Sequence, residues 1–577
     1  MLKIHAACAV FFSVLGVPWH TQALPLDIRI RPVASGQPLL LDSLRYEKSG
    51  KETFSVSRLS YLVSGLALQC PDGTWVEPGF QAAWLDSFSR RNSFRVQDVP
   101  PGRYIALRFA VGLDEKTNNA DPASFPAGHP LNPAVNKLHW SWQGGYIFLA
   151  LEGHYRVAGT RRGYTLHFAR TANRTEVTLP ISLDFKSASA INIDFDITSL
   201  LAVPRPVVFS RDGSSTHSRK GDRMAAALAA NLPGAFRLRY IEIAEDQDVA
   251  VPKKSPLYLP ENPQPFPFKM SATFPLPSLP MDNPLLKGRV ELGRKIFSDT
   301  RLSRDGSLSC ASCHLHGKAF TDGLAKSVGI DGRSGTRNSM PLFNLAWKNQ
   351  FFWDGRAASL RDQVTMPIES HLELDDSLEN VVAKLSAEDS YLAAFSQAYA
   401  SPEVTTEKIA LALESFLLTL TSYDSKFDRA MAGKAELSEQ EQRGLELFMT
   451  EYEPRSRQFG ADCFHCHGGP LFSDHDFHNN GLHSLAGDEG IGGGRFATPS
   501  LRNVALTAPY MHDGRFSSLE EVVAHYNSGL QRSDQLDPNL AKHPETGLGL
   551  TKSDEAALVA FLKALTDPKY TTLPAKP

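Results

Sequence analysis

Two copies of one five-residue pattern constrain this chain more than any other feature. The pattern Cys-x-x-Cys-His occurs at Cys310-Ala311-Ser312-Cys313-His314 and again at Cys463-Phe464-His465-Cys466-His467. In haem c attachment, two such thiols form thioether bonds to the haem vinyl groups and the histidine binds iron. Given six cysteines and 18 histidines among 577 residues, chance gives even one copy on the order of 2 in 1000 times. Zinc-binding cysteine pairs and disulfides are the alternatives; we predict two haems.

The N-terminus predicts export. Residues 1–23 combine a polar start at Lys3, an apolar run over 6–17 and small residues before Leu24, which is typical of a cleaved signal peptide. That run is too short to span a bilayer, and no later run reaches about 18 apolar residues. We therefore expect a soluble periplasmic protein without a membrane span. The net charge of −3 indicates no nucleic-acid partner.

The patterning divides the mature chain into two regions. Over 24–245, apolar residues alternate with period two, as in 177–185 and 191–197, which predicts an antiparallel β-sandwich. A helix over 222–232 is expected to end at Pro233-Gly234. A proline-rich segment, 246–280, predicts an extended linker. Residues 281–577 read as two helical lobes, about 281–435 and 436–577, because a helix precedes each haem motif.

Residues 285–577 resemble the bacterial diheme cytochrome c peroxidase superfamily, which includes MauG. The resemblance rests on the segments 352–357, 367–373, 498–503 and 507–514. It implies a mainly α domain of two cytochrome c-like lobes, with His314 and His467 as proximal ligands. It also implies that Trp353 relays electrons between the haems, that Gln363 and Glu373 lie beside the peroxide-binding haem, and that a calcium ion binds Asn338, Thr507 and Pro509.

Tyr526 discriminates within this superfamily. It occupies the position that is methionine in ordinary peroxidases and tyrosine in MauG. A phenolate is a hard, anionic ligand, so we expect it to lower the potential of the His467 haem and favour high-valent iron. Glu373 would move a proton between the peroxide oxygens. Leu374 and His371 depart from the family pattern around Glu373.

The N-terminal region resembles the MbnP-like family. The resemblance rests on 129–133, 139–146, 151–153 and 166–168 and covers most of 25–238. It implies a copper site that includes kynurenine, an oxidised tryptophan, and a MauG-like partner enzyme, here on the same chain. The candidate copper ligands are His139, His154, His167 and His217. Trp140 is the first candidate for oxidation because His139 adjoins it; Trp142 is the second, and Trp75 and Trp84 are the least favoured.

These observations predict a self-modifying enzyme. It would use hydrogen peroxide to oxidise a tryptophan of its own N-terminal domain to kynurenine and so create a copper site, with two haem c groups, calcium and copper as cofactors. One alternative is an ordinary peroxidase that takes electrons from a small periplasmic electron-transfer protein. Another is a non-enzymatic copper-binding electron-relay protein with two six-coordinate haems. Tyr526 favours the first function over the ordinary peroxidase; the sequence makes no prediction of the oligomeric state.

Overall fold

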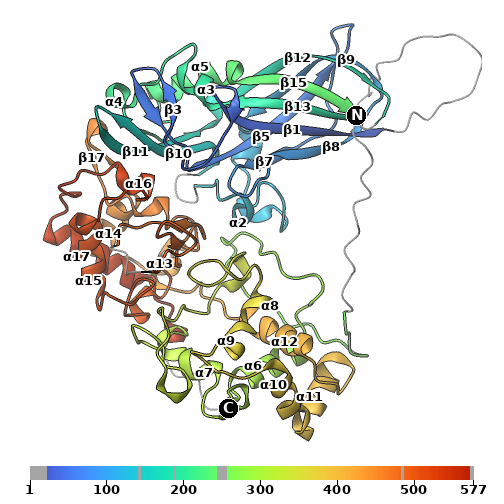
Figure 1. Cartoon of the computed structure of the whole chain (residues 1–577), viewed down its shortest axis with the longest axis vertical. Helices are drawn as coiled ribbons and strands as arrows, with labels where there is room; N and C mark the ends of the chain where they lie inside the picture. The colour runs from blue at the N-terminus through green and yellow to red at the C-terminus, as the bar shows by residue number, and fades with distance from the viewer. Residues whose placement is uncertain (1–22, 141–143, 188, 244–256, 483–486, 572–577) are drawn as a thin grey trace, which may run out of the picture. The chain divides into compact units, whose positions relative to one another are not determined.

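The computed structural model describes residues 23–140, 144–187, 189–243, 257–482 and 487–571 (Figure 1). The predicted signal peptide and Trp142 therefore lie outside the described residues, apart from residue 23. The chain divides into two compact units: the first extends to Val251 and includes Pro538–Lys542, and the second comprises Pro252–Asp537 and His543–Pro577. Among the described residues, no helix is long and apolar enough to cross a bilayer.

The first unit is built from two β-sheets (Figure 1). The smaller sheet has the order β15-β13-β1-β2, and β8 also pairs with β1. Its strands are β1 (Leu24–Ala34), β2 (Gln37–Pro38), β8 (Ser93–Val99), β13 (Ser189–Asp196) and β15 (Phe236–Ile243). The larger sheet has the order β12-β9-β5-β10-β11-β14, with shorter strands added to β5 and β10. Its strands are β3 (Tyr46–Lys48), β4 (Glu52–Phe54), β5 (Arg58–Gln69), β6 (Trp75–Val76), β7 (Ala82–Asp86), β9 (Gly102–Val111), β10 (Ile147–Val157), β11 (Thr160–Ala169), β12 (Thr175–Phe185) and β14 (Ser215–Thr216).

Among the described strands of this unit, the pairing is antiparallel with two exceptions. β1 and β13 are parallel, from Leu26 opposite Ser189 to Val33 opposite Asp196, and the short β14 is parallel to β11. A parallel pair needs a long crossover connection, and the strands β2–β12 supply it between β1 and β13. The predicted alternation is seen in β12, where every second residue from Val177 to Phe185 is buried. β13 is buried along most of its length, as expected for a strand that is covered on both faces of its sheet.

The two sheets share one hydrophobic core, which confirms the predicted sandwich. Tyr61 of the larger sheet packs edge-on against Phe195 of the smaller, with ring centroids 5.2 Å apart. Phe109 and Phe236 make an equivalent contact at 5.2 Å. Full burial of each such aromatic side chain stabilises the fold by about 1.5–3 kcal/mol.

The helix expected over 222–232 is α5 (Arg223–Ala235). It begins where predicted, because the Asp222 side chain accepts hydrogen bonds from the backbone N–H groups of Met224 and Ala225. It continues through Pro233 to Ala235, so the predicted end is two to three residues too early. α5 lies against α3 (Ile197–Ala202). The other short helices of the unit are α1 (Glu115–Asn118), α2 (Pro133–Asn136), α4 (Phe209–Asp212) and α16 (Pro538–Ala541).

The second unit is mainly helical, and its two lobes repeat one arrangement. In the first lobe α6 (Lys287–Phe297) crosses α12 (Thr406–Leu418) at Gly293, where an added Cβ would lie 2.0 Å from the Ala412 carbonyl oxygen. In the second lobe α14 (Glu439–Met449) crosses α17 (Lys552–Ala564) at Gly444, and an added Cβ would again lie 2.0 Å from a carbonyl oxygen, that of Ala557. The other α-helices of the unit are α7 (Cys310–Cys313), α8 (Leu360–Gln363), α9 (Met366–Glu369), α10 (Leu378–Ser386), α11 (Asp389–Tyr399), α13 (Lys426–Met431) and α15 (Leu519–Ala524).

Each lobe also contains a tight loop with the sequence Asp-Gly-Arg near its centre. One loop is closed by a bridge between Phe351 and Ala357, and the other by a bridge between Tyr510 and Phe516. The glycines, at φ +66° and +68°, have the left-handed backbone that favours glycine. The residue before Asp-Gly-Arg is Trp353 in the first lobe and His512 in the second. We call these segments the Trp353 loop and the His512 loop.

The described part of the predicted linker belongs to the second unit and packs inside it. Phe274 is fully buried, with its ring centroid 5.2 Å from that of Trp347. The Trp347 indole N–H donates to the Pro275 carbonyl at 2.6 Å. These contacts anchor residues 274–275 instead of leaving them as a free spacer.

Candidate functional site

Both haem motifs form short helical turns. The first is α7 (Cys310–Cys313), and the second is the 3₁₀ turn Cys463–His465. A helical turn places residues three apart on one side, so the two cysteines of a motif can reach one haem edge. The four motif cysteines are free thiols, which argues against disulfides. Burial raises the pKa of Cys310 to about 12 and that of Cys313 to about 11.

The two motif histidines are held in the same way. His314 Nδ1 lies 2.7 Å from the Phe320 carbonyl oxygen, and His467 Nδ1 lies 3.2 Å from that of Phe472. A carbonyl can only accept, so Nδ1 carries the proton and Nε2 keeps its lone pair for a metal. Burial lowers the pKa of both imidazoles, which favours the neutral, metal-binding form. These residues therefore fit two haem irons.

Glu373 lies beside the first haem motif. Its negative charge raises the pKa of both Cys310 and Cys313. Burial raises the pKa of Glu373 itself, against the opposing effects of a hydrogen bond with Ser370 and the charge of Arg356. A carboxyl with a raised pKa is suited to proton transfer, and Glu373 would supply that chemistry to peroxide at the first haem if it lies beside the iron.

The backbone around Glu373 is tightly fixed. Ile330 N–H donates to the Glu373 carbonyl at 3.0 Å, and an added Cβ on Gly329 would lie 2.1 Å from the Leu372 carbonyl oxygen. The two departures from the family pattern have different surroundings: Leu374 is buried, whereas the exposed His371 bonds Asp375 at 2.9 Å.

Gln363, the other residue expected near the peroxide, ends α8 and is half-buried. Its side chain makes no hydrogen bond in the described part of the chain, so its role stays a prediction.

Trp353 is buried between segments from both lobes. Its indole N–H donates to the Asn338 carbonyl at 2.9 Å, while Asn338 N–H donates to the His512 carbonyl at 2.8 Å. The next residue, Ser339, places its Oγ 3.5 Å from Nδ1 of His314. A short bonded path thus connects the first haem histidine, Trp353 and the His512 loop. The role of Trp353 as an electron relay stays a prediction.

The expected calcium ligands have oxygens of the right kind. The Asn338 amide nitrogen donates to the Leu324 carbonyl at 2.8 Å, which leaves its side-chain oxygen for a cation. Thr507 uses its hydroxyl to donate to Val504 at 3.1 Å, and its carbonyl and that of Pro509 are the groups expected to bind. Hard oxygen ligands suit calcium, and the three-residue set stays a prediction.

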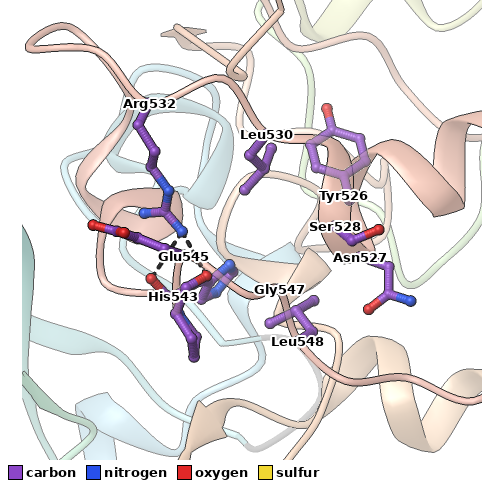
Figure 2. A pocket seen from close by; sticks show the side chains of 10 residues that line it. Tyr526, Asn527, Ser528, Leu530, Arg532, His543, Glu545, Gly547 and Leu548 are labelled. Carbon is purple, nitrogen blue, oxygen red and sulfur yellow. Dashed lines mark hydrogen bonds between the residues drawn. The ribbon is translucent and has the colours of Figure 1, made fainter.

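Tyr526 lies beside the second haem motif. α15 continues into a π-helical turn, His525–Gly529, a wide turn frequent at functional sites. Burial raises the pKa of Tyr526 to about 12, with the charges of Cys466 and Cys463 acting in the same direction. The ring lines a pocket with Asn527, Leu530 and Arg532, whose guanidinium donates to the carbonyls of His543 and Pro544 at 2.9 and 2.8 Å (Figure 2).

Asn480 is a residue that the sequence analysis missed. Its amide nitrogen lies 3.4 Å from the Tyr526 hydroxyl oxygen and 3.5 Å from the Met511 sulfur. Its carbonyl accepts from His525 Nε2 at 3.0 Å. Asn480 therefore holds the Tyr526 turn at two points.

In the first unit, the structure brings His167 and His217 together. β14 runs parallel to β11 with Leu166 opposite Thr216, and continuing this register sets His167 opposite His217. His167 Nδ1 lies 3.3 Å from His217 Nε2. The Trp140 ring centroid lies 5.5 Å from that of His217 and 6.3 Å from that of His167.

Glu152 supports this pair and was not identified from the sequence as a site residue. Its carboxylate lies 2.9 Å from His167 Nε2 and accepts from Arg58 at 3.0 Å. A carboxylate bonded to the second imidazole nitrogen orients a metal-binding histidine. Glu152 lies two residues from Ala150, which is paired with His167 on the neighbouring strand. Because alternate residues of a strand share a face, Glu152 lies on the same face of the sheet as His167.

The other candidate histidines lie in different surroundings. His139 packs against Tyr146 with ring centroids 4.7 Å apart, and burial lowers its pKa to about 4. His154 is paired with Gly163. It lies four residues along β10 from Ala150, the residue paired with His167, which corresponds to about 13 Å along the strand. Of the least favoured tryptophans, Trp84 donates its indole N–H to Ser60 at 2.8 Å, and Trp75 packs under the Arg108 guanidinium.

Comparisons with known proteins agree with this division. A family model described as di-haem cytochrome c peroxidase matches residues 287–436, and the MbnP model matches residues 23–218. The methylamine utilization protein MauG of Methylorubrum extorquens is 36% identical over 313 residues, which cover 52% of this chain and 84% of that protein. Cytochrome c551 peroxidase of Pseudomonas aeruginosa is 32% identical over 318 residues, covering 51% and 84%. A solved structure of a MauG-like protein associated with microbial copper homeostasis is 33% identical, covers 54% of this chain and 98% of its own, and has a TM-score of 0.48.

The fold and the paired motifs define a di-haem c-type oxidoreductase that acts with peroxide or a related oxidant. The chain belongs to the di-haem cytochrome c peroxidase and MauG family, and it carries an MbnP domain ahead of the enzyme.

Proposed function

We propose that this protein, exported to the periplasm, uses hydrogen peroxide to oxidise Trp140 of its own MbnP domain to kynurenine and so completes a copper site. The observation that carries the proposal is the packing of the Trp140 ring against His167 and His217. Imidazole is a good ligand for copper. An unmodified indole nitrogen only donates hydrogen bonds, whereas the aryl amine of kynurenine adds a nitrogen ligand beside the two imidazoles.

The residues of the second unit have separate parts in this reaction. The haems, when bound, supply oxidation by peroxide and electron transfer. Glu373 would hold and move the peroxide proton at its carboxylate. Trp353 would carry electrons between the lobes, and Tyr526 would offer a phenolate oxygen to the His467 haem. A calcium ion bound by Asn338, Thr507 and Pro509 would link the loops of the two lobes that contain these residues.

The overall conversion balances with peroxide as the only oxidant. Trp140 and two molecules of hydrogen peroxide give N-formylkynurenine and two molecules of water, as the bond between C2 and C3 of the indole breaks and each carbon gains one oxygen. Hydrolysis then releases formate and leaves kynurenine. The residue loses one carbon and gains one oxygen, a net increase of about four mass units, and the oxidising chemistry is that of the haem.

Peptide mass spectrometry of the full-length, haem-loaded protein after peroxide treatment tests the proposal. We expect the increase of about four mass units at Trp140, located by fragmentation, together with tight copper binding. Trp140→Phe should lose both, whereas the matched control Trp84→Phe should keep both. Glu373→Gln, which retains both haem ligands, should accumulate the modification far more slowly.

Two results would change the conclusion. Modification at Trp142 instead would keep the reaction and move it to the second candidate. If every tryptophan keeps its unmodified mass, self-modification is excluded, and an ordinary peroxidase supplied by an electron-transfer protein becomes the better function.

A further inference from the structure

The second haem motif contains an imidazole that haem attachment does not use. His465 stands between the two cysteines, where the first motif has Ser312. Its Nε2 lies 2.9 Å from a carboxylate oxygen of Asp462 and 4.0 Å from one of Glu451. One ligand atom from each of these three residues lies within 4.8 Å of the other two. The spacing is that of side chains grouped around a single ion.

The chain is built to bring the three residues together. Glu451 follows α14 and opens a short hairpin of β16 (Tyr452–Glu453) and β17 (Gln458–Phe459), and Gly460 N–H donates to the Glu451 carbonyl at 3.1 Å. An added Cβ on Gly460 would lie 1.8 Å from the Thr450 carbonyl oxygen, so the return of the chain requires glycine here. Asp462 then adopts a left-handed backbone, φ +62°, which aspartate tolerates.

Charge and burial favour a cation at this cluster. The side chains of Glu451, Asp462 and His465 are 5%, 1% and 2% exposed. A divalent cation between the two carboxylates and the imidazole would pair their buried charge, which a buried ionised group requires. One nitrogen and two carboxylate oxygens match a zinc site with an open fourth position. Magnesium and calcium prefer oxygen ligands alone.

A further histidine orients the cluster. His543 Nε2 lies 2.9 Å from the second oxygen of Asp462, and its ring packs edge-on against Tyr452 with centroids 5.8 Å apart. A ligating carboxylate is commonly held by such an outer partner.

We propose that Glu451, Asp462 and His465 bind a divalent transition-metal ion, for which zinc is the probe, with His543 as the positioning residue for Asp462. None of the three residues is one of the cysteines and histidines expected to attach a haem. The ion would fix the hairpin of residues 452–459 to the second haem motif. The proposal does not depend on the oxidation of Trp140.

Zinc content measures the site directly. The full-length, haem-loaded protein is treated with a chelator and dialysed against zinc, and zinc and iron per chain are counted by elemental analysis. All samples carry His167→Gln and His217→Gln, so that zinc bound at that pair does not enter the count. We expect Glu451→Gln and Asp462→Asn to lose one zinc per chain relative to this background. Glu446→Gln, an exposed position on α14, is the matched control and should keep it.

X-ray absorption at the zinc edge identifies the ligands. The bound zinc should show one imidazole, and His465→Gln should remove that signal while iron per chain stays constant. If Asp462→Asn impairs haem attachment, Glu451→Gln still decides the question, because it lies outside the motif. Equal zinc in the background and in Glu451→Gln, or no zinc in either, would overturn the proposal. The tryptophan mass increase, measured on protein with His167 and His217 intact, reports the proposed function independently.

Discussion

Glu373→Gln is the most direct test of the chemistry proposed for the first haem. Glutamine keeps the shape of the side chain but cannot accept or release the peroxide proton. The backbone cannot shift to compensate, because the Glu373 carbonyl bonds Ile330 N–H at 3.0 Å and would lie 2.7 Å from an added Cβ on Gly329. The loss is therefore that of one acid–base group, about 10²–10⁴-fold in rate or about 3–5 kcal/mol of barrier.

Stopped-flow absorption after mixing with peroxide measures this rate. Burial raises the pKa of Glu373, so the ionised form that accepts a proton is lost at a higher pH than for an ordinary glutamate. The wild-type rate should thus fall as pH decreases through that raised pKa, whereas the rate of the variant should not show this pH dependence. Glu369→Gln, an exposed position on α9, is the control. Equal rates for wild type and Glu373→Gln, with both haems attached, would refute the reasoning.

Three further predictions concern the second lobe. Tyr526→Met should change the low-spin electron paramagnetic resonance signal of the His467 haem, since a thioether replaces a phenolate. An unchanged spectrum would show that Tyr526 does not bind the iron. Gly444→Ala should lower stability by about 1–3 kcal/mol in thermal unfolding, because the new Cβ overlaps a carbonyl of α17 at 2.0 Å. The control Gly234→Ala in α5, where an added Cβ meets nothing within 4 Å, should be neutral or stabilising. Arg502→Leu should cost about 3–5 kcal/mol in denaturant unfolding, because it leaves the carboxylate of Asp428 without its two bonds at 2.7 and 2.8 Å. The arginine also keeps the pKa of Asp428 low despite burial. The stability difference between wild type and Arg502→Leu should therefore disappear as pH falls through that pKa.

Features that depend on residues close in sequence could be predicted. The haem motifs, the capped start of α5 and the alternation of β12 are all local patterns, and the structure contains the expected turn, helix and strand. The parallel pairing of β1 with β13 could not be predicted in this way. The two strands are separated by most of the sandwich, and no local pattern distinguishes a parallel partner from an antiparallel one.

The candidate copper site shows the same limit. His167 was recognised from its sequence neighbours, but its contact with His217 depends on the register between β11 and β14. Glu152 likewise enters the site only through the pairing of β10 with β11. Asn480 bonds Tyr526 from 46 residues away in sequence, and the sequence offered no signal that would have selected it.

The connection of Trp353 to the His512 loop runs through the main chain of Asn338. Its carbonyl and N–H make both bonds, and its side chain takes part in neither. Almost any substitution at residue 338 would leave this connection intact, so the predicted calcium ligand can be removed without breaking the proposed electron path. Proline is the exception, because it has no N–H to donate. A mutant series at this single position can therefore test the proposed calcium site and the proposed electron path separately.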